Sequence, residues 1–190
     1  CLRQAREAGF TGMETGRRFP MSMAELGPVL DRHGMSVCGG WFSGTILDGD
    51  VAENKDRIRP QMDLFVAAGA PCIVYGEVAR SIQGDRSRPL ASKPRLADEE
   101  MRLYARRMTE FGEWCADQGM PLAYHHHMAA VVETEAELDA FMAGSGEGIP
   151  LLYDAGHMAM AGGDVLRVID NHHARISHVH AKDVRQEVVD

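Results

Sequence analysis

The chain has 190 residues and a formal net charge of −8, with 45% hydrophobic and 25% charged residues. These values suit a globular protein with a sizeable core, and we expect residues 1–190 to form a single domain. The negative charge, without any dense Lys/Arg stripe, argues against nucleic acid or an acidic membrane surface as the main partner. No apolar run has the length of a membrane span.

Helical patterns alternate with short, strand-like segments along the chain. The predicted helices are residues 2–8, 22–33, 51–68, 98–118, 134–142 and 163–171. The predicted strands are residues 12–15, 36–39, 72–75, 122–125, 151–154 and 176–179. Pro60 lies inside the third helical pattern, where it predicts a kink or a new helix start. A capping pattern, Thr134-Glu135-Ala136-Glu137, opens the fifth helix.

Four stretches repeat one arrangement, in which a helical pattern is followed by a glycine and then by a short apolar run. The glycines are Gly9, Gly34, Gly69 and Gly119. A glycine just after a helix is typical of the left-handed conformation that ends helices. Apolar runs of this length are typical of parallel strands, which are buried on both faces. The alternation therefore predicts a parallel α/β fold.

Six strands would also suit a flavodoxin-like or Rossmann sheet, but no GxGxxG motif follows the first strand. A (β/α)8 TIM barrel fits the repeat better. The chain begins at Cys1 inside helix-like sequence and ends soon after a strand-like run. We therefore expect a fragment of a barrel that lacks the first strand and the last strand or strands. The longest connection, residues 78–97, follows a strand C-terminus, where barrels build their active sites.

Polar side chains gather where the predicted strands end, and eight of the nine histidines follow residue 124. These strand-end residues are Glu14, Trp41, Glu77, His125, His127, Asp154, His157, His178, His180 and Lys182. Alternate residues of a strand point to one face. His125 and His127 should thus project together while His126 points away towards the helices. His178, His180 and Lys182 should likewise share a face.

Neighbouring strands of a barrel would bring these side chains together at its mouth. Asp154 and His157 lie where a strand turns into a Gly-containing loop. Imidazoles with a carboxylate form a ligand set suited to Mn, Fe, Co or Zn. Three strand ends that each offer His or Asp therefore predict a metal site.

Other polar residues have simpler explanations. His33, His172 and His173 lie near helix C-termini, where the helix dipole favours them. The four cysteines are widely spaced and make no CxxC pair, which is typical of reduced thiols in the cytoplasm. Residues 80–95 are rich in Arg and Lys and are expected to form a solvated loop, or one that closes over a substrate.

Several motifs, in this order, resemble the inosose dehydratases of myo-inositol catabolism, which belong to the xylose isomerase-like barrel superfamily. They are GFTGMETG, GGWFSG, IVYGE, LAYHHHMAAVVET, LLYDAGHMAMAGGD and ISHVHAKDVR. The resemblance implies a (β/α)8 barrel that binds a divalent metal, Mn²⁺ or Co²⁺. It implies His125, Asp154 and His180 as metal ligands, with a further Glu from a last strand that this chain lacks. His125 stands where many members of the superfamily have Glu.

The reaction that the resemblance implies is loss of water from 2-keto-myo-inositol (scyllo-inosose), which gives a trihydroxycyclohexane-dione. His127 is expected to be the base, because it lies beside the metal without being a ligand. A second group must protonate the departing hydroxyl, and the candidates are Lys182, His157 and Glu77. Contacts with a small polyol ketone are expected from Glu14, Trp41 and His178, although His178 could instead orient a metal ligand.

Two alternatives to the dehydratase remain open. A sugar or cyclitol epimerase or isomerase on the same barrel would share the metal but return the proton to carbon. An inactive fragment is the second alternative, because a sheet with six of the eight barrel strands has two edge strands without a neighbour. Such edges could also pair with a second copy, so a homo-oligomer is possible.

Overall fold

The computed structural model describes residues 1–185 and 187. Six strands form one parallel sheet whose spatial order follows the sequence. They are β1 (Gly12–Thr15), β2 (Ser36–Gly44), β3 (Ile73–Glu77), β4 (Leu122–His125), β5 (Leu151–Asp154) and β6 (Ile176–His180). All six predicted strands are confirmed, although β2, β3 and β6 continue past their predicted ends.

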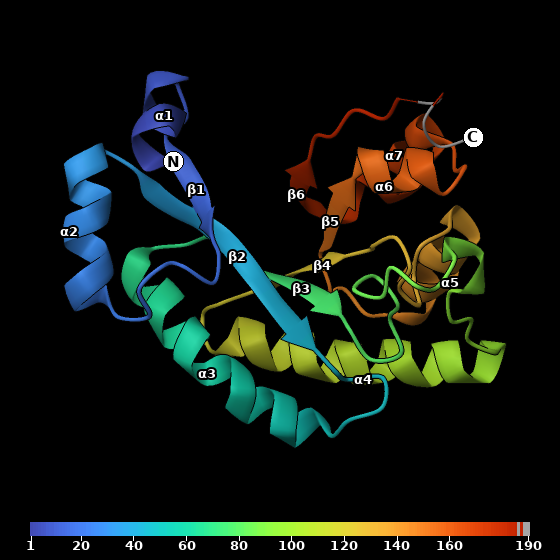
Figure 1. Ribbon diagram of the computed structural model, residues 1–190. Helices are drawn as coiled ribbons and strands as arrows, with labels where there is room; N and C mark the ends of the chain where they lie inside the picture. Colours follow the sequence, from blue (N-terminus) through green and yellow to red (C-terminus); the bar gives the residue numbers. More distant parts are fainter. Residues whose placement is uncertain (186, 188–190) are drawn as a thin grey trace.

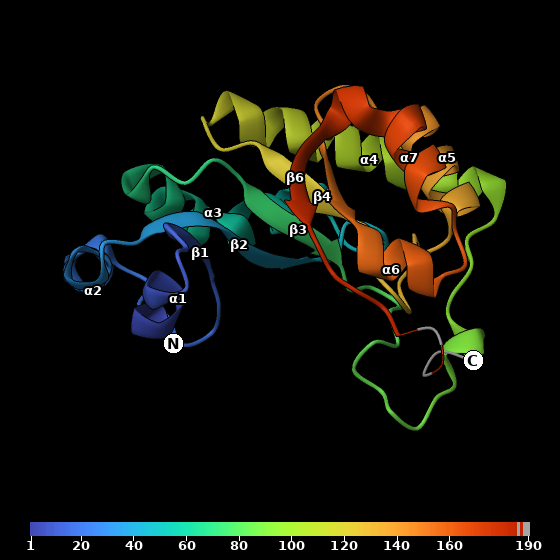
Figure 2. The ribbon, with the colours of Figure 1, turned by 90° about the horizontal axis from the view of Figure 1, so that it is seen from above.

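Helices follow the strands in a repeating pattern. They are α1 (Leu2–Glu7), α2 (Met23–His33), α3 (Val51–Ala68), α4 (Asp98–Asp117), α5 (Glu135–Gly144), α6 (Ala155–Met160) and α7 (Val165–His172). Figure 1 shows that the sheet curls, with α3 and α4 along its convex side and with β1 and β6 facing each other across the open side. Seen from above in Figure 2, the strands form part of a barrel wall. The predicted class, an incomplete (β/α)8 barrel, is confirmed.

The left-handed glycines predicted to follow helices are confirmed by the backbone. Gly34 and Gly69 adopt left-handed conformations directly after α2 and α3, with φ of 59° and 66°. The capping pattern before α5 also forms, because the Thr134 hydroxyl accepts a hydrogen bond from the Glu137 amide and the Glu137 carboxylate accepts one from the Thr134 amide. These local signals set where each helix ends and the next strand begins.

Two predictions about helices are wrong. Pro60 does not start a new helix, since α3 runs unbroken from Val51 to Ala68. Burial of Ile58, Met62 and Phe65 against the sheet outweighs the one backbone hydrogen bond that proline removes. The second error concerns the segment after β5, which is the short helix α6 rather than a loop. Asp154 starts this helix because its side chain accepts the amide of His157.

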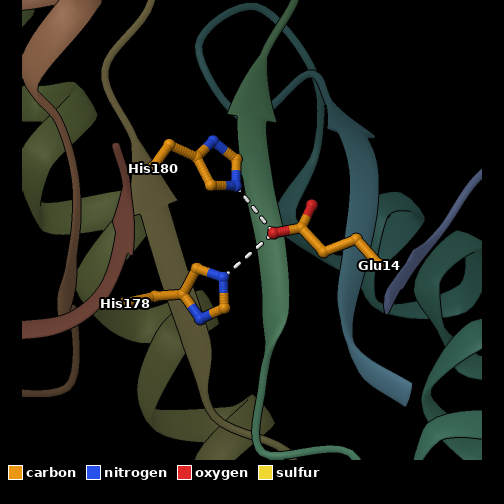
Figure 3. Close-up of side chains that lie close together, drawn as sticks. All are labelled: Glu14, His178 and His180. Carbon is orange, nitrogen blue, oxygen red and sulfur yellow. Dashed lines mark hydrogen bonds and ion pairs between the residues drawn. The ribbon is translucent and has the colours of Figure 1, made fainter. Parts of the chain in front are cut away.

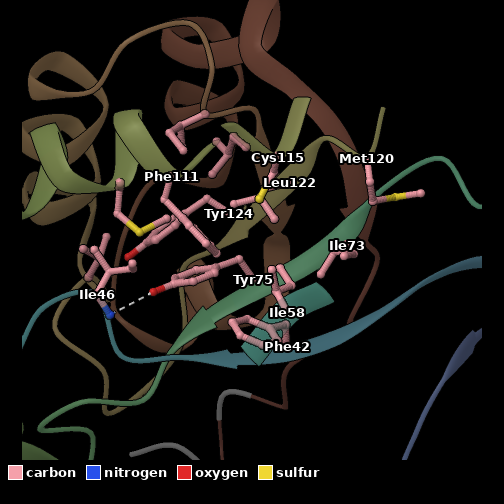
Figure 4. Close-up of a cluster of buried hydrophobic side chains, with 14 of the residues drawn as sticks. Phe42, Ile46, Ile58, Ile73, Tyr75, Phe111, Cys115, Met120, Leu122 and Tyr124 are labelled. Atoms are coloured by element: carbon pink, nitrogen blue, oxygen red, sulfur yellow. Dashed lines mark hydrogen bonds between the residues drawn. The ribbon is translucent and has the colours of Figure 1, made fainter. Parts of the chain in front are cut away.

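The main core lies between the convex face of the sheet and the helices (Figure 4). Its centre is aromatic: the Tyr124 ring stacks on Phe141 with centroids 4.1 Å apart, and on Tyr75 with centroids 6.0 Å apart. The concave face carries only a small apolar cluster, formed by Cys72, Val74, Ala123 and Leu152, with Trp41 packed against it. The polar groups of the concave face therefore lie above a thin apolar floor.

No helix in the described part of the chain is both long enough and apolar enough to cross a membrane.

The concave face depends on the absence of a side chain at Gly76. A Cβ placed there would lie 1.9 Å from the Trp41 ring. We expect Gly76→Ala to lower the free energy of unfolding by about 1–3 kcal/mol, since it overpacks a closely filled site. Urea denaturation should detect this change. Gly84→Ala is the matched control, because a Cβ at Gly84 meets nothing within 4 Å. Equal unfolding free energies for the two variants would contradict this account.

Candidate metal centre

Three neighbouring strands bring the predicted metal ligands together at the carboxyl edge of the sheet. Asp154 ends β5 and pairs directly with His180 at the end of β6. His125 ends β4, the strand on the other side of β5. Asp154 is fully buried and His125 is 3% exposed. Parallel pairing in this register therefore places one carboxylate between two imidazoles.

The ligand atoms of these three residues form a nearly equilateral triangle. His125 Nε2 lies 3.2 Å from His180 Nδ1 and 3.3 Å from Asp154 Oδ2. The third side, from His180 Nδ1 to Asp154 Oδ2, measures 3.5 Å. Ligand atoms of a tetrahedral ion with bonds of about 2.1 Å are about 3.4 Å apart. The three atoms thus have the spacing that a divalent ion requires, and their chemistry suits Mn, Co or Zn.

His157 offers a third nitrogen, and a fourth candidate ligand atom, close to this triangle. Its Nε2 lies 3.7 Å from Asp154 Oδ2, and His125, Asp154 and His157 also form a group whose ligand atoms all lie within 4.8 Å of one another. Burial, and next the nearby His127, lower the pKa of His157 to about 3. His157 is therefore a neutral imidazole.

Asp154 is the negative centre of this cluster. Burial alone would raise the pKa of its carboxyl, but hydrogen bonds from His125, His180 and Lys182 lower it far below its usual range. The Lys182 ammonium pairs with Asp154 Oδ2, and it also donates a hydrogen bond to His157 Nε2 over 3.2 Å. The buried carboxylate is thus ionised and surrounded by cations and N–H donors.

A second cluster lies across the concave face and joins β1 to β6. Glu14 Oε1 accepts hydrogen bonds from His178 Nε2 at 2.9 Å and from His180 Nε2 at 2.6 Å (Figure 3). Burial opposes ionisation of Glu14, yet these bonds lower its pKa to about 2. The pKa of His178 is raised to about 10, first by Cys72, whose Sγ lies 3.8 Å from Nδ1, and then by Glu14. Bonds to Asp154 and Glu14 raise the pKa of His180 to about 9.

The three consecutive histidines divide between the two faces of β4 as predicted. His126 is fully buried on the helix side, where its ring stacks on Tyr153 and its Nε2 accepts the Asp154 amide at 3.1 Å. His127 lies on the concave side, with its ring centroid 4.1 Å from that of His157. Its Nδ1 lies 2.8 Å from the Met128 carbonyl, so Nδ1 carries the proton and Nε2 is left free to accept one.

The structure also places the two remaining strand-end candidates. Trp41 lies beside the histidines, with its ring centroid 5.6 Å from His125 and 5.8 Å from His127. Glu77 does not join them. It shares the convex face with Tyr75, whose hydroxyl donates to Glu77 Oε2 at 2.9 Å, and it accepts the amides of Leu47 and Ala79.

The sequence interpretation missed the polar contact of Cys72, a residue that it placed only at the start of the predicted strand 72–75. The sequence does contain a sign of this position: Cys72 lies two residues before Val74, so strand alternation places both side chains on the concave face. The simpler explanations for the other histidines are consistent with the structure, since His172 Nε2 contacts Asp139 Oδ1 at 2.6 Å on the helical surface.

A family model described as the xylose isomerase-like TIM barrel matches residues 2–190, and the chain therefore belongs to this family. Within it the chain is similar to proteins named inosose dehydratase, as its motifs predict. It is 39% identical over 185 residues to the inosose dehydratase of Erwinia tasmaniensis, which covers 96% of this chain and 62% of that protein. It is also 39% identical over 189 residues to the rhizopine catabolism protein MocC of Rhizobium meliloti, covering 100% of this chain and 58% of MocC.

The fold is shared with solved structures. The crystal structure of the probable 3-DHS dehydratase AsbF from Bacillus anthracis matches with a TM-score of 0.75 at 15% sequence identity, covering 96% of this chain and 66% of AsbF. The chain spans about three fifths of the length of the curated relatives named above.

Glu77 generates a prediction about pH and stability. Burial raises its pKa from 4.5 to about 7 in the folded protein. The folded state therefore holds this proton more tightly than the unfolded state, and the resulting stability is present below about pH 4.5 and lost by about pH 7. We expect this group to account for roughly 3 kcal/mol of that loss. Urea denaturation between pH 4.5 and 8 should show a smaller loss for Glu77→Gln than for the wild type.

Glu53→Gln is the matched control for this experiment, because Glu53 is exposed on α3. It should keep the pH dependence of the wild type. If Glu77→Gln also kept the full pH dependence, Glu77 would be ionised throughout this range.

Proposed function

We propose that the protein is a metal-dependent dehydratase that removes water from a cyclitol ketone, 2-keto-myo-inositol, to give a trihydroxycyclohexane-dione. The observation that carries this proposal is the triangle of His125, Asp154 and His180 ligand atoms, with a free imidazole nitrogen and an ammonium group beside it. Relatives named inosose dehydratase support the substrate class. All four cysteines are free, in keeping with a place in the cytoplasm.

The three triangle residues would hold the divalent ion, for which we propose Mn²⁺ or Co²⁺. When bound, such an ion supplies a Lewis acid that polarises the ketone next to the proton to be removed. Asp154 contributes the negative charge, and its side-chain bond to the His157 amide fixes its orientation. His125, the buried last residue of β4, contributes a nitrogen.

His127 is the base in this proposal. Its protonated Nδ1 is held by the Met128 carbonyl, so Nε2 presents a lone pair on the concave side of the sheet. Nε2 takes the proton from the carbon next to the ketone as the carbon–carbon double bond forms. The ring also packs near Trp41, which keeps it on this face.

Lys182 ranks above His157 as the acid. Its Nζ is a hydrogen-bond donor to both Asp154 and His157, whereas His157 Nε2 accepts that bond. Nζ gives a proton to the departing hydroxyl, the carbon–oxygen bond breaks, and water leaves. Glu77 has no part in this scheme because it lies behind the sheet.

Trp41 also lines a cavity of about 460 Å³. Its polar lining residues are Thr15, Arg17, Ser43, Gln61 and Gln83. Hydroxyl and amide groups of this kind suit a ring that carries several hydroxyls. We propose that Trp41 forms the wall between this cavity and the metal triangle and contacts the substrate ring.

The test is to incubate the protein with 2-keto-myo-inositol and follow the ultraviolet absorbance of the dione product. We expect product to form, to stop after EDTA, and to return after Mn²⁺ or Co²⁺ is added. An epimerised or isomerised polyol with no loss of water would replace the dehydratase with the epimerase or isomerase alternative. Bound metal without any reaction of the ketone would favour a different polyol substrate.

Two variants separate the base from the metal ligands. His127→Ala should keep the metal but lower kcat by about 10²–10⁴-fold, the usual range for loss of a general base. Asp154→Ala should lose the metal itself, as measured by elemental analysis of the purified protein. His33→Ala, at the end of α2, is the histidine control. Full turnover by His127→Ala would remove this residue from the mechanism.

A further inference from the structure

Glu14 makes a contact that the catalytic scheme does not use. It extends from β1 across the concave face to β6, where one of its oxygens accepts hydrogen bonds from Nε2 of both His178 and His180 (Figure 3). The sheet is adapted to this contact. The β1–β2 register shifts between Met13 and Glu14 because Cys38 of β2 has no partner, and this shift pairs Glu14 with Gly39. Gly39, paired with Glu14, has φ of 154° and no side chain to fill the space beside the Glu14 Cγ.

We propose that Glu14 is a positioning residue that sets the affinity of the site for its divalent ion by holding His180, and that His178 holds Glu14. This inference deepens the proposed function and rests on the metal triangle described there. Glu14 would contact neither the ion nor the reacting atoms.

The first argument is the tautomer of His180. An ionised carboxylate only accepts hydrogen bonds, so the 2.6 Å contact requires a proton on Nε2. In the neutral ring Nδ1 is then unprotonated, and it faces His125 Nε2 and Asp154 Oδ2. Glu14 thus selects the tautomer and the ring orientation in which His180 can bind a metal.

The second argument is charge. Asp154 is the only carboxylate of the triangle, and it supplies one negative charge against the two positive charges of the ion. Glu14 adds a second negative charge through the imidazole, which makes Nδ1 a better electron donor. A neutral amide at this position could still accept the Nε2 proton but would not supply the charge.

The third argument is the double use of Glu14 Oε1. His178 donates to the same oxygen from the layer beneath His180, and its other nitrogen lies 3.8 Å from Cys72 Sγ. The carboxylate is thereby fixed from below as well as from the side. The competing explanation is that Glu14, His178 and His180 bind a second ion directly, since their ligand atoms also lie within 4.8 Å of one another.

The test compares metal binding by the wild type, Glu14→Gln and His178→Gln. Dissociation constants for Mn²⁺ and Co²⁺ are measured by competition with a coloured chelator, and the visible spectrum is recorded at saturating Co²⁺. We expect Glu14→Gln to weaken binding by about 10–100-fold. The saturated Co²⁺ spectrum should keep its intensity, because the ligand set is unchanged, and each chain should bind one ion. His178→Gln retains an N–H donor and should weaken binding by less than about 10-fold.

Glu77→Gln is the matched control, because it makes the same change at a buried carboxyl on the opposite face of the sheet. It should bind metal as the wild type does. Glu14→Asp serves if Glu14→Gln fails to fold, and it should also bind more weakly because a shorter side chain cannot reach both rings.

Wild-type affinity in a folded Glu14 variant would overturn the inference. Two ions per wild-type chain, one of them lost in both Glu14→Gln and His178→Gln, would overturn it in favour of direct ligation. A wild type that binds no ion would instead overturn the metal centre of the proposed function, and this inference with it.

Discussion

The Asp154 carboxylate is the constraint on which the rest of the structure depends. It is fully buried, yet one oxygen accepts the backbone amide that starts α6 and the other contacts two imidazoles and an ammonium group. Burying a charge is costly unless it is paired and hydrogen-bonded. Each neighbouring element supplies one of those partners, so the register of β4, β5 and β6 and the start of α6 are tied to a single side chain.

This arrangement favours positively charged groups around the carboxylates. Lys182 pairs with Asp154 from the segment after β6, and protonated imidazoles are favoured around both carboxylates. A proton, an ammonium group or a divalent ion would each offset the negative charge of these carboxylates. The predicted metal chemistry thus follows from a site that is acidic at its centre and lined by nitrogen donors, within a family that shares this barrel.

Much of this site could be predicted from the sequence because strand periodicity is local. The two-residue period of a strand correctly placed His126 and His127 on opposite faces of the sheet. It also placed His178 and His180 on the same face. Glu77 shows where the same rule fails. Val74 and Tyr75 are both apolar, so hydrophobicity did not reveal which of them faces the helices, and the side of Glu77 remained undetermined.

Two features depended on information that is not local. The helix after β5 is only six residues long and contains Gly156, so no apolar period marks it. It forms because Asp154 supplies its first side-chain bond. The reach of Glu14 depends on how far the whole sheet curls and on the register shift at Cys38 of β2, and neither is encoded in the four residues of β1.

The strand order has a consequence for the path of folding. Each strand pairs with the next one in the chain, so nearly all of the sheet can grow by adding neighbouring units. The contact between Glu14 and His178 is different, because it joins residues 164 positions apart. Closing so long a loop is entropically unfavourable until the strands between are in place. The sheet should therefore be assembled before its two outer strands meet through this carboxylate, which makes the contact a late step in folding.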